Sequence, residues 1–97
     1  MRLYRLTSLA DDEVDAIYAA GIEMFGMTHA HTYFADLTSA FAFLADNPLV
    51  ARLRREIEPP VRVWRYKAHL IFYEVEADGI LVLRVRHGRE DWMSSEG

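Results

Sequence analysis

The sequence predicts an α+β domain in which a helical hairpin covers one face of an antiparallel sheet, in the order β-α-α-β-β-β. Three observations favour this fold. Apolar residues recur at helical spacing between residues 8 and 45, and β-branched and aromatic residues dominate residues 61–86. The pair Asp78-Gly79 separates two of the later apolar runs and supplies the positive φ that a hairpin turn requires.

A strand and a first helix are expected at the start of the chain. Residues 2–6 alternate polar and apolar side chains, which is the pattern of a half-buried strand. Ser8 can then cap a helix, with Asp11 as the answering acid of a capping box. We expect Gly26 to end this helix. Gly21 costs about 1 kcal/mol relative to alanine in mid-helix, so it should admit a close neighbour. The apolar face comprises Val14, Ile17, Tyr18, Gly21 and Phe25.

A second helix is expected from Thr28 to Ala45, where Asp46-Asn47-Pro48 stops it. Because its link to the first helix is short, the two helices should form an antiparallel hairpin. The apolar face of the second helix comprises Ala30, Tyr33, Phe34, Leu37, Phe41 and Leu44.

The last third of the chain is expected to form a three-stranded meander. Pro59-Pro60 forces an extended entry into the sheet. The strands then begin near Val61 and cover His69–Glu76 and Ile80–Arg86, and the first strand of the chain completes the sheet beside one of them. Aromatic residues here, such as Trp64, are expected to pack in the core or at its rim.

Alternation along the last strand divides its side chains between two faces. We expect the helices to cover Leu81, Leu83 and Val85, and we expect His87 on the same side. The opposite face would carry Ile80, Val82, Arg84 and Arg86. An apolar patch there would need a cover, for which a partner chain is the natural candidate. Arg84 could pair with Glu74 or Glu76 across the hairpin.

Length and composition favour one folded domain over residues 1–97, with 92–97 expected as a frayed tail. The chain contains no cysteine, which excludes disulfides and thiolate chemistry. Neither a charged-then-apolar leader nor an apolar run of about 18 residues is present, so we expect a cytoplasmic protein.

Charge is distributed unevenly along the chain. Residues 1–48 carry two Arg against seven acidic residues, whereas residues 52–67 carry six basic residues against two acidic ones. Such a cluster is either a solvated surface or an anchoring patch for an acidic partner, since arginine binds carboxylates bidentately. The arginines that would form the patch are Arg52, Arg54, Arg55, Arg62 and Arg65.

Metal, cofactor and nucleophilic chemistry are not indicated. His29 and His31 would point about 200° apart on a helix and could not share a metal ion. His69 and His87 could lie near each other on adjacent strands, yet no cysteine or convergent carboxylate completes a site. Ser94 and Ser95 lie in the expected tail, outside any nucleophile-elbow setting.

An ordered set of segments carries a family resemblance. The run Arg62–Tyr73, followed by Asp78–Arg89, resembles the RelE/ParE toxin superfamily of type II toxin–antitoxin systems, and more closely its ParE branch. Asn47-Pro48 and the arginines after them also resemble the loop between helix and sheet in that branch. No single motif is diagnostic, whereas the ordered set is fairly specific.

The resemblance implies a small, non-enzymatic inhibitor of DNA gyrase that is neutralised by a ParD-like antitoxin in a hetero-oligomer. In that family the C-terminal segment of the antitoxin wraps the toxin. We expect Arg84, Arg86, His87, Arg89 and Trp92 to contact the target, and the Arg52–Arg65 patch described above to contact the antitoxin. No cofactor and no membrane or sequence-specific nucleic-acid contact is expected.

Two alternatives to gyrase inhibition stay open. The first is a ribosome-dependent mRNA endonuclease of the RelE type, in which arginines stabilise the phosphate and His87 acts as a base. That alternative is disfavoured by the absence of a tyrosine after Arg89, since the indole of Trp92 cannot exchange a proton near neutral pH. The second is a non-toxic module that retains only antitoxin binding. A purely structural role for Arg84, His87 and Arg89 is also open.

Overall fold

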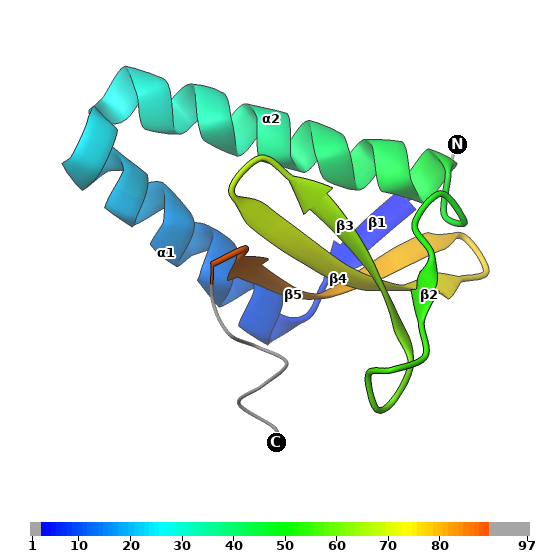
Figure 1. The fold of residues 1–97 in the computed structure, drawn as a ribbon. Coiled ribbons are helices and arrows are strands. Elements are labelled where there is room, and N and C mark those ends of the chain that lie inside the picture. Colours follow the sequence, from blue (N-terminus) through cyan, green and yellow to red (C-terminus); the bar gives the residue numbers. More distant parts are fainter. Residues whose placement is uncertain (1–2, 90–97) are drawn as a thin grey trace.

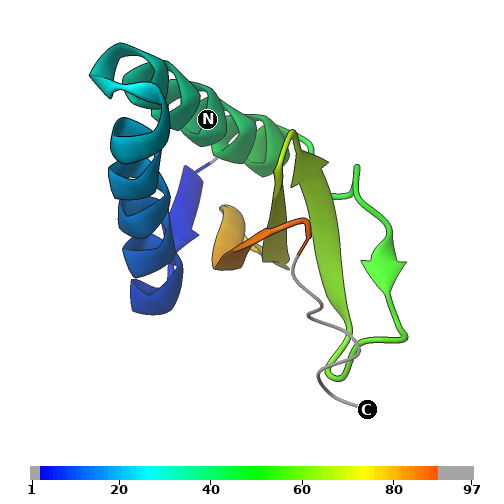
Figure 2. The same cartoon turned by 60° about the vertical axis from the view of Figure 1, so that its left-hand side comes forward.

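The computed structural model describes residues 3–89. Two helices pack on one side of a five-stranded sheet, as Figures 1 and 2 show from two directions. The elements in chain order are β1 (Leu3–Leu6), α1 (Ser8–Phe25), α2 (Met27–Asp46), β2 (Leu53–Arg54), β3 (Val61–Tyr66), β4 (His69–Glu76) and β5 (Gly79–His87). The α+β class and the helical hairpin over one face of the sheet are therefore confirmed.

The sheet differs from the expected one in two respects. Its strand order is β1-β5-β4-β3-β2, so a short strand, β2, is added beyond the predicted meander. In addition, β1 runs parallel to β5, so the sheet is mixed and not wholly antiparallel. Neither difference could be predicted from the sequence. A strand of two residues is too short to show alternation, and the residues of β1 do not indicate whether its neighbour runs parallel or antiparallel.

The start of α1 is fixed by Thr7, not by Ser8 as predicted. The Thr7 hydroxyl oxygen accepts a hydrogen bond from the backbone N–H of Ala10 at 3.0 Å, which satisfies one of the unpaired donors at a helix start. The same hydroxyl donates to the carbonyl oxygen of Leu83 at 2.9 Å. Thr7 therefore joins the helix start to β5, and the predicted capping box between Ser8 and Asp11 is not formed.

The two helices are joined by Gly26 alone, whose φ of 90° is accessible to glycine at low cost. The helices approach each other closely where Gly21 faces α2. A Cβ atom on Gly21 would lie 3.2 Å from the Cβ of Ala30. The expected close neighbour of Gly21 is thus confirmed.

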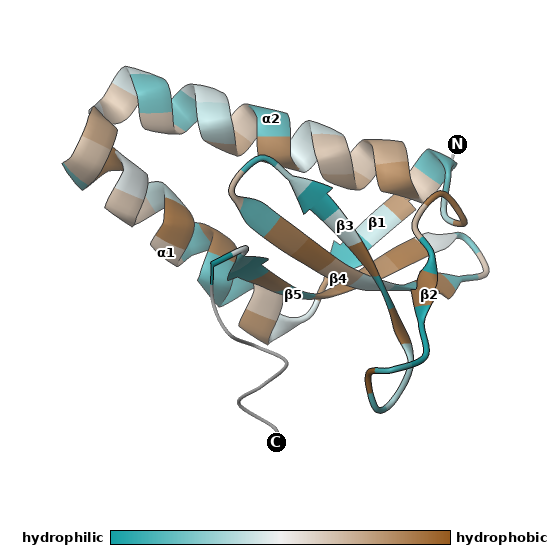
Figure 3. Cartoon of the chain, viewed as in Figure 1, coloured by the Kyte–Doolittle hydropathy of each residue, from teal (hydrophilic) through white to brown (hydrophobic). Residues whose placement is uncertain are grey.

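The main core lies between the helices and the sheet. Figure 3 shows hydrophobic residues on both helices and along most of β4. The fully buried side chains at its centre are Leu37, Phe41, Leu44, Ile71, Tyr73, Ile80 and Val82. The hydroxyl of Tyr73 donates to the carbonyl oxygen of Pro48 at 2.8 Å, so this buried polar group is satisfied.

The predicted faces of β5 are partly wrong because the strand contains a bulge. Phe72 pairs with Arg84, whereas the next residue, Tyr73, pairs with Val82, so Leu83 is an extra residue on β5. Ile80 and Val82 therefore join Val85 in the core beneath the helices, and Leu83 packs against a cluster on the opposite face. Strict alternation had placed Ile80 and Val82 on that opposite face.

The face of the sheet away from the helices has its own small apolar cluster. Val61, Val63, Leu70 and Phe72 are each 7–8% exposed, and Ile57 and Leu83 pack against them. Trp64 and Tyr66 point to the other side and pack against the main core. The expected packing role of these aromatic residues is confirmed. Within residues 3–89, neither helix is long and apolar enough to cross a membrane.

Candidate functional site: the C-terminal rim and the interhelical groove

The C-terminal half of β5 lies at an edge of the sheet. There, side chains in place of a neighbouring strand satisfy its backbone hydrogen-bonding groups. The parallel partner β1 pairs with β5 only from Gly79 to Val82. Beyond that point the carbonyl oxygen of Leu83 accepts from the Thr7 hydroxyl, and the N–H of Val85 donates to Glu13 Oε1 at 2.8 Å. The start of α1 therefore satisfies the backbone groups that β1 leaves uncovered.

Glu13 also binds the side chain of Arg84. Its Oε2 accepts from Nη2 of Arg84 at 2.6 Å and its Oε1 accepts from Nε at 3.1 Å, a bidentate arrangement that the planar guanidinium favours. The prediction that Arg84 pairs with Glu74 or Glu76 is wrong, because Glu76 binds Arg5 of β1 at 2.6 Å. The ion pair of Arg84 with Glu13 therefore links β5 to α1.

Three further predicted target-binding residues lie at this end of β5. The Nε atom of Arg86 is 4.0 Å from Glu13 Oε2, at the limit of an ion pair. The Nδ1 atom of His87 accepts a hydrogen bond from the backbone N–H of Arg89 at 3.0 Å, and both residues are exposed. Trp92, the remaining predicted residue, lies outside the described residues.

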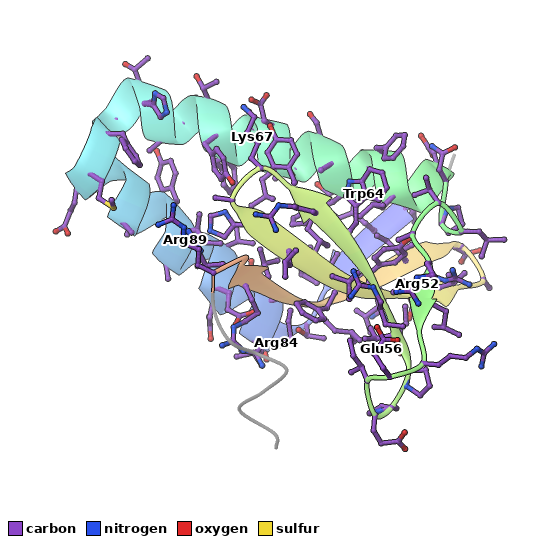
Figure 4. The ribbon with its side chains drawn as sticks, viewed as in Figure 1. Arg52, Glu56, Trp64, Lys67, Arg84 and Arg89 are labelled. Atoms are coloured by element: carbon purple, nitrogen blue, oxygen red, sulfur yellow. The ribbon has the colours of Figure 1, made fainter. Side chains whose placement is uncertain are left out.

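The arginine patch predicted from residues 52–65 divides into two groups. Arg52 and Arg54 lie 3.6 and 3.8 Å from Glu56, and Arg62 donates to the carbonyl oxygen of Ala51 at 2.6 Å. Arg55, which lies between Arg54 and Glu56 in the sequence, is exposed. Figure 4 shows Arg52 and Glu56 at one end of the sheet and Arg89 at the other.

The pKa of Glu56 is lowered, first by a hydrogen bond from its own backbone and then by the charges of Arg52 and Arg54. Glu56 therefore remains a carboxylate between these arginines.

Arg65 belongs in space with the C-terminal end of β5. Its two Nη atoms lie 3.0 Å from the position that a Cβ atom on Gly88 would occupy, so the guanidinium packs against Gly88. We call the surface formed by Arg65, Arg86, His87 and Arg89 the C-terminal rim. It joins one residue of the predicted antitoxin patch to three of the predicted target residues.

The sequence did not predict a groove between the two helices, which we call the interhelical groove. It has a volume of about 550 Å³ and is lined by apolar residues of both helices, with the turn between β3 and β4 and the end of β5 closing the sheet side. The apolar lining includes Ile17, Met24, Phe25, Phe34 and Leu37. Met24 and Phe25 are 71% and 62% exposed. The signal that could have indicated the groove is that apolar residues continue to the tip of the hairpin, past the end of the sheet.

A polar cluster closes the sheet end of this groove. The hydroxyl oxygen of Tyr33 lies 2.7 Å from Nδ1 of His69, and the rings of His69 and His87 are 5.3 Å apart. Burial raises the pKa of the Tyr33 hydroxyl, outweighing the opposing hydrogen bond with the Ala68 backbone, so Tyr33 stays protonated at neutral pH. Lys67 adds a positive charge in the adjoining turn, beside the ring of Tyr66.

The expected proximity of His69 and His87 is therefore confirmed. His29 lines the same groove from α2. Within residues 3–89, no three histidine or acidic side chains come together as a metal site would require.

The sequence matches a family of toxin components of type II toxin–antitoxin systems. The family model described as "ParE toxin of type II toxin-antitoxin system, parDE" matches residues 4–92. Toxin ParE1 of Mycobacterium tuberculosis, from strains CDC 1551 / Oshkosh and ATCC 25618 / H37Rv, is 32% identical over 89 residues, which are 91% of each chain. The chain belongs to the ParE toxin family.

A solved structure supports the fold independently of that sequence match. The chromosomal ParDE toxin–antitoxin system from P. aeruginosa contains a chain that superposes with a TM-score of 0.74. The alignment covers 90% of this chain and 96% of that one at 22% sequence identity. The resemblance to the ParE branch that the sequence indicated is thus confirmed, and so is the fold.

Proposed function

We propose that this ParE-family toxin inhibits DNA gyrase by binding through the C-terminal rim and Trp92, with no bond made or broken by the toxin. The observation that carries the proposal is the exposed cationic end of β5 in a chain of the ParE family. His87 and Arg89 are exposed there, and Arg65 of β3 packs beside them. A rim of this kind suits the charged surface of gyrase or of the DNA that gyrase holds.

Arg84, which the family resemblance places among the target-binding residues, has a different role in this proposal. Its guanidinium is bidentate to Glu13, and the Glu13 side chain is only 18% exposed. A target would have to break this pair to reach Arg84. We therefore assign target contact to Arg86, His87, Arg89 and Trp92, and assign to Arg84 the task of holding the rim in place.

A ParD-like antitoxin is the proposed partner, and the surface around Arg52, Arg54 and Arg55 is its proposed cationic contact. Arg52 and Arg54 face Glu56 at 3.6 and 3.8 Å on an exposed surface. Exposed pairs of this kind contribute about 0–1 kcal/mol, so an antitoxin carboxylate can replace Glu56 at little cost. Arg62, a member of the predicted patch, instead donates to the Ala51 carbonyl oxygen and holds the preceding loop.

Expression of the chain in bacteria with and without its cognate antitoxin tests the proposed function. Gyrase inhibition predicts growth arrest with an SOS response and cleaved chromosomal DNA, both reversed when the antitoxin is co-expressed. Cleaved transcripts without DNA damage would instead support a ribosome-dependent endonuclease. Normal growth with antitoxin binding retained would identify a non-toxic binding module.

A further inference from the structure

The interhelical groove is mostly apolar between the helices and polar on its sheet side. Its walls are apolar side chains of α1 and α2, and Phe25 at the tip of the hairpin is 62% exposed. The sheet side carries Lys67 in the turn between β3 and β4, and the hydroxyl of Tyr33 beside His69. A surface divided in this way suits an amphipathic occupant that has an apolar part and one polar group.

The charge that the groove offers to an occupant is positive. Lys67 lines it together with three histidines, whereas none of its described lining residues is acidic. Figure 4 shows Lys67 at the turn between β3 and β4. Lys67 is not ion-paired with any acidic side chain of residues 3–89. Asp36, which shares a separate hollow with Lys67, lies beyond ion-pair distance of it. The polar group of the occupant is therefore an anion.

We infer that the interhelical groove binds a fatty acid of medium chain length, whose acyl chain lies between α1 and α2 and whose carboxylate meets Lys67. This inference goes beyond the proposed gyrase inhibition and does not depend on it. The volume of the groove, about 550 Å³, lies within the range of about 300–1,000 Å³ that is usual for small-molecule sites.

Two properties of an acyl carboxylate fit this groove. The acyl chain has no N–H or C=O groups, so it leaves no polar group without a hydrogen bond between the apolar walls. The single negative charge of the carboxylate matches the single charge of Lys67.

The first experiment titrates the full-length toxin with octanoate and decanoate by calorimetry at neutral pH, below the concentrations at which they form micelles. Each additional buried methylene strengthens binding about fourfold, so decanoate should bind about 15-fold more tightly than octanoate. Decyltrimethylammonium has a chain of the same length and the opposite charge, and it should bind at least about tenfold more weakly than decanoate. Equal affinities within either pair, or no binding of decanoate, would overturn the inference.

A substitution of Lys67 tests the contact with the carboxylate. Lys67 has a φ of 50°, which asparagine also tolerates, so Lys67→Asn removes the charge and retains the turn. This variant should bind decanoate about tenfold more weakly than the wild type. Arg55→Asn, which removes an exposed charge outside the groove, is the matched control and should bind as the wild type does. Equal affinities of the two variants would overturn the assignment of Lys67.

A second pair of variants tests whether the acyl chain lies in the groove. Ala20 and Ala19 are adjacent, exposed positions of α1, but only Ala20 lines the groove. Ala20→Glu adds a charge that the acyl chain would desolvate, so it should weaken decanoate binding at least about tenfold, whereas Ala19→Glu should leave it unchanged. Equal effects of the two variants would overturn the inference.

Light scattering distinguishes a fatty acid from a second copy of the toxin as the occupant. The complex with decanoate should contain one toxin chain. A toxin dimer that forms without decanoate and that Ala20→Glu separates would place a second copy in the groove and would overturn the inference.

Discussion

Replacing Glu13 should destabilise the fold in two graded steps, because this carboxylate performs two separable tasks. One oxygen accepts from the buried backbone N–H of Val85, and the carboxylate also binds Arg84. Glu13→Gln retains an amide oxygen for Val85 and loses only the charge pairing. Glu13→Ala loses both contacts.

The magnitudes follow from the exposure of each partner. The Arg84 side chain is 37% exposed and that of Glu13 is 18% exposed, so solvent screens their attraction. We expect Glu13→Gln to lower the free energy of unfolding by about 0.5–1 kcal/mol. Val85 is 2% exposed, so an unsatisfied N–H there is costly. Glu13→Ala should therefore lower the free energy of unfolding by about 2–3 kcal/mol in total.

Urea unfolding followed by circular dichroism measures these differences. Asp12→Ala, an exposed neighbour on the first turns of α1, is the matched control and should change stability by less than about 0.5 kcal/mol. A double-mutant cycle with Arg84→Ala should give a coupling energy of about 1 kcal/mol. The reasoning is refuted if Glu13→Ala is as stable as the wild type, or if Glu13→Gln and Glu13→Ala lower the free energy of unfolding equally.

Two further substitutions test the edge and the core of the sheet. Gly79→Ala should lower the free energy of unfolding by about 3 kcal/mol or more, since a Cβ there would lie 1.7 Å from the Leu3 carbonyl oxygen and displace β1. Gly26→Ala, also at positive φ but with open space around it, should cost only about 1–2 kcal/mol in the same urea titration. Tyr73→Phe should cost about 1–2 kcal/mol, because Pro48 loses its hydrogen-bond donor. Burial raises the pKa of Tyr73 against the opposing effects of the Ala51 backbone and Arg62, so its contribution is present below about pH 10 and is lost above it. Unfolding measured from pH 8 to 11 should therefore show a smaller alkaline loss of stability in Tyr73→Phe than in the wild type, and identical pH profiles would contradict this assignment.

The elements that the sequence predicts well are those whose pattern is repeated and local. The two helices, their short link and a tight hairpin turn before the last strand all depend on contacts within a few residues, and all are present in the structure. The turn itself consists of Ala77 and Asp78, one position earlier than the predicted pair, and Gly79, at positive φ, begins β5. Gly21 is a further example, since an unfavourable residue in a helix indicated a close approach of α2. Errors at the first helical turn were small, because Thr7 and Ser8 are adjacent and chemically similar caps.

The features that the sequence could not predict depend on long-range geometry. A bulge at Leu83 reverses the alternation of β5 without any residue type that marks it, so Ile80 and Val82 were assigned to the wrong face. The partner of Arg84 is separated from it by 71 positions, and the acidic start of α1 had a sufficient local explanation in the helix dipole.

The candidate site was predicted in part for the same reason. His87 and Arg89 were expected at the exposed end of β5, and the structure places them there. Arg65 was grouped by sequence with Arg52, yet the pairing of β3 and β4 brings it to the opposite end of the sheet. The interhelical groove arises from the angle between two helices, a quantity that no local pattern specifies.

Gyrase activity in the presence of purified toxin tests the central claim most directly. Supercoiling and DNA cleavage would be compared for the wild type, for Arg86→Ala with Arg89→Ala, and for Arg52→Ala with Arg55→Ala. The account predicts that the wild type and the Arg52/Arg55 variant inhibit supercoiling and accumulate cleaved DNA, whereas the Arg86/Arg89 variant loses this effect at least tenfold. Equal inhibition by all three proteins would contradict the assignment of the C-terminal rim, and no effect of the folded wild type would contradict gyrase as the target.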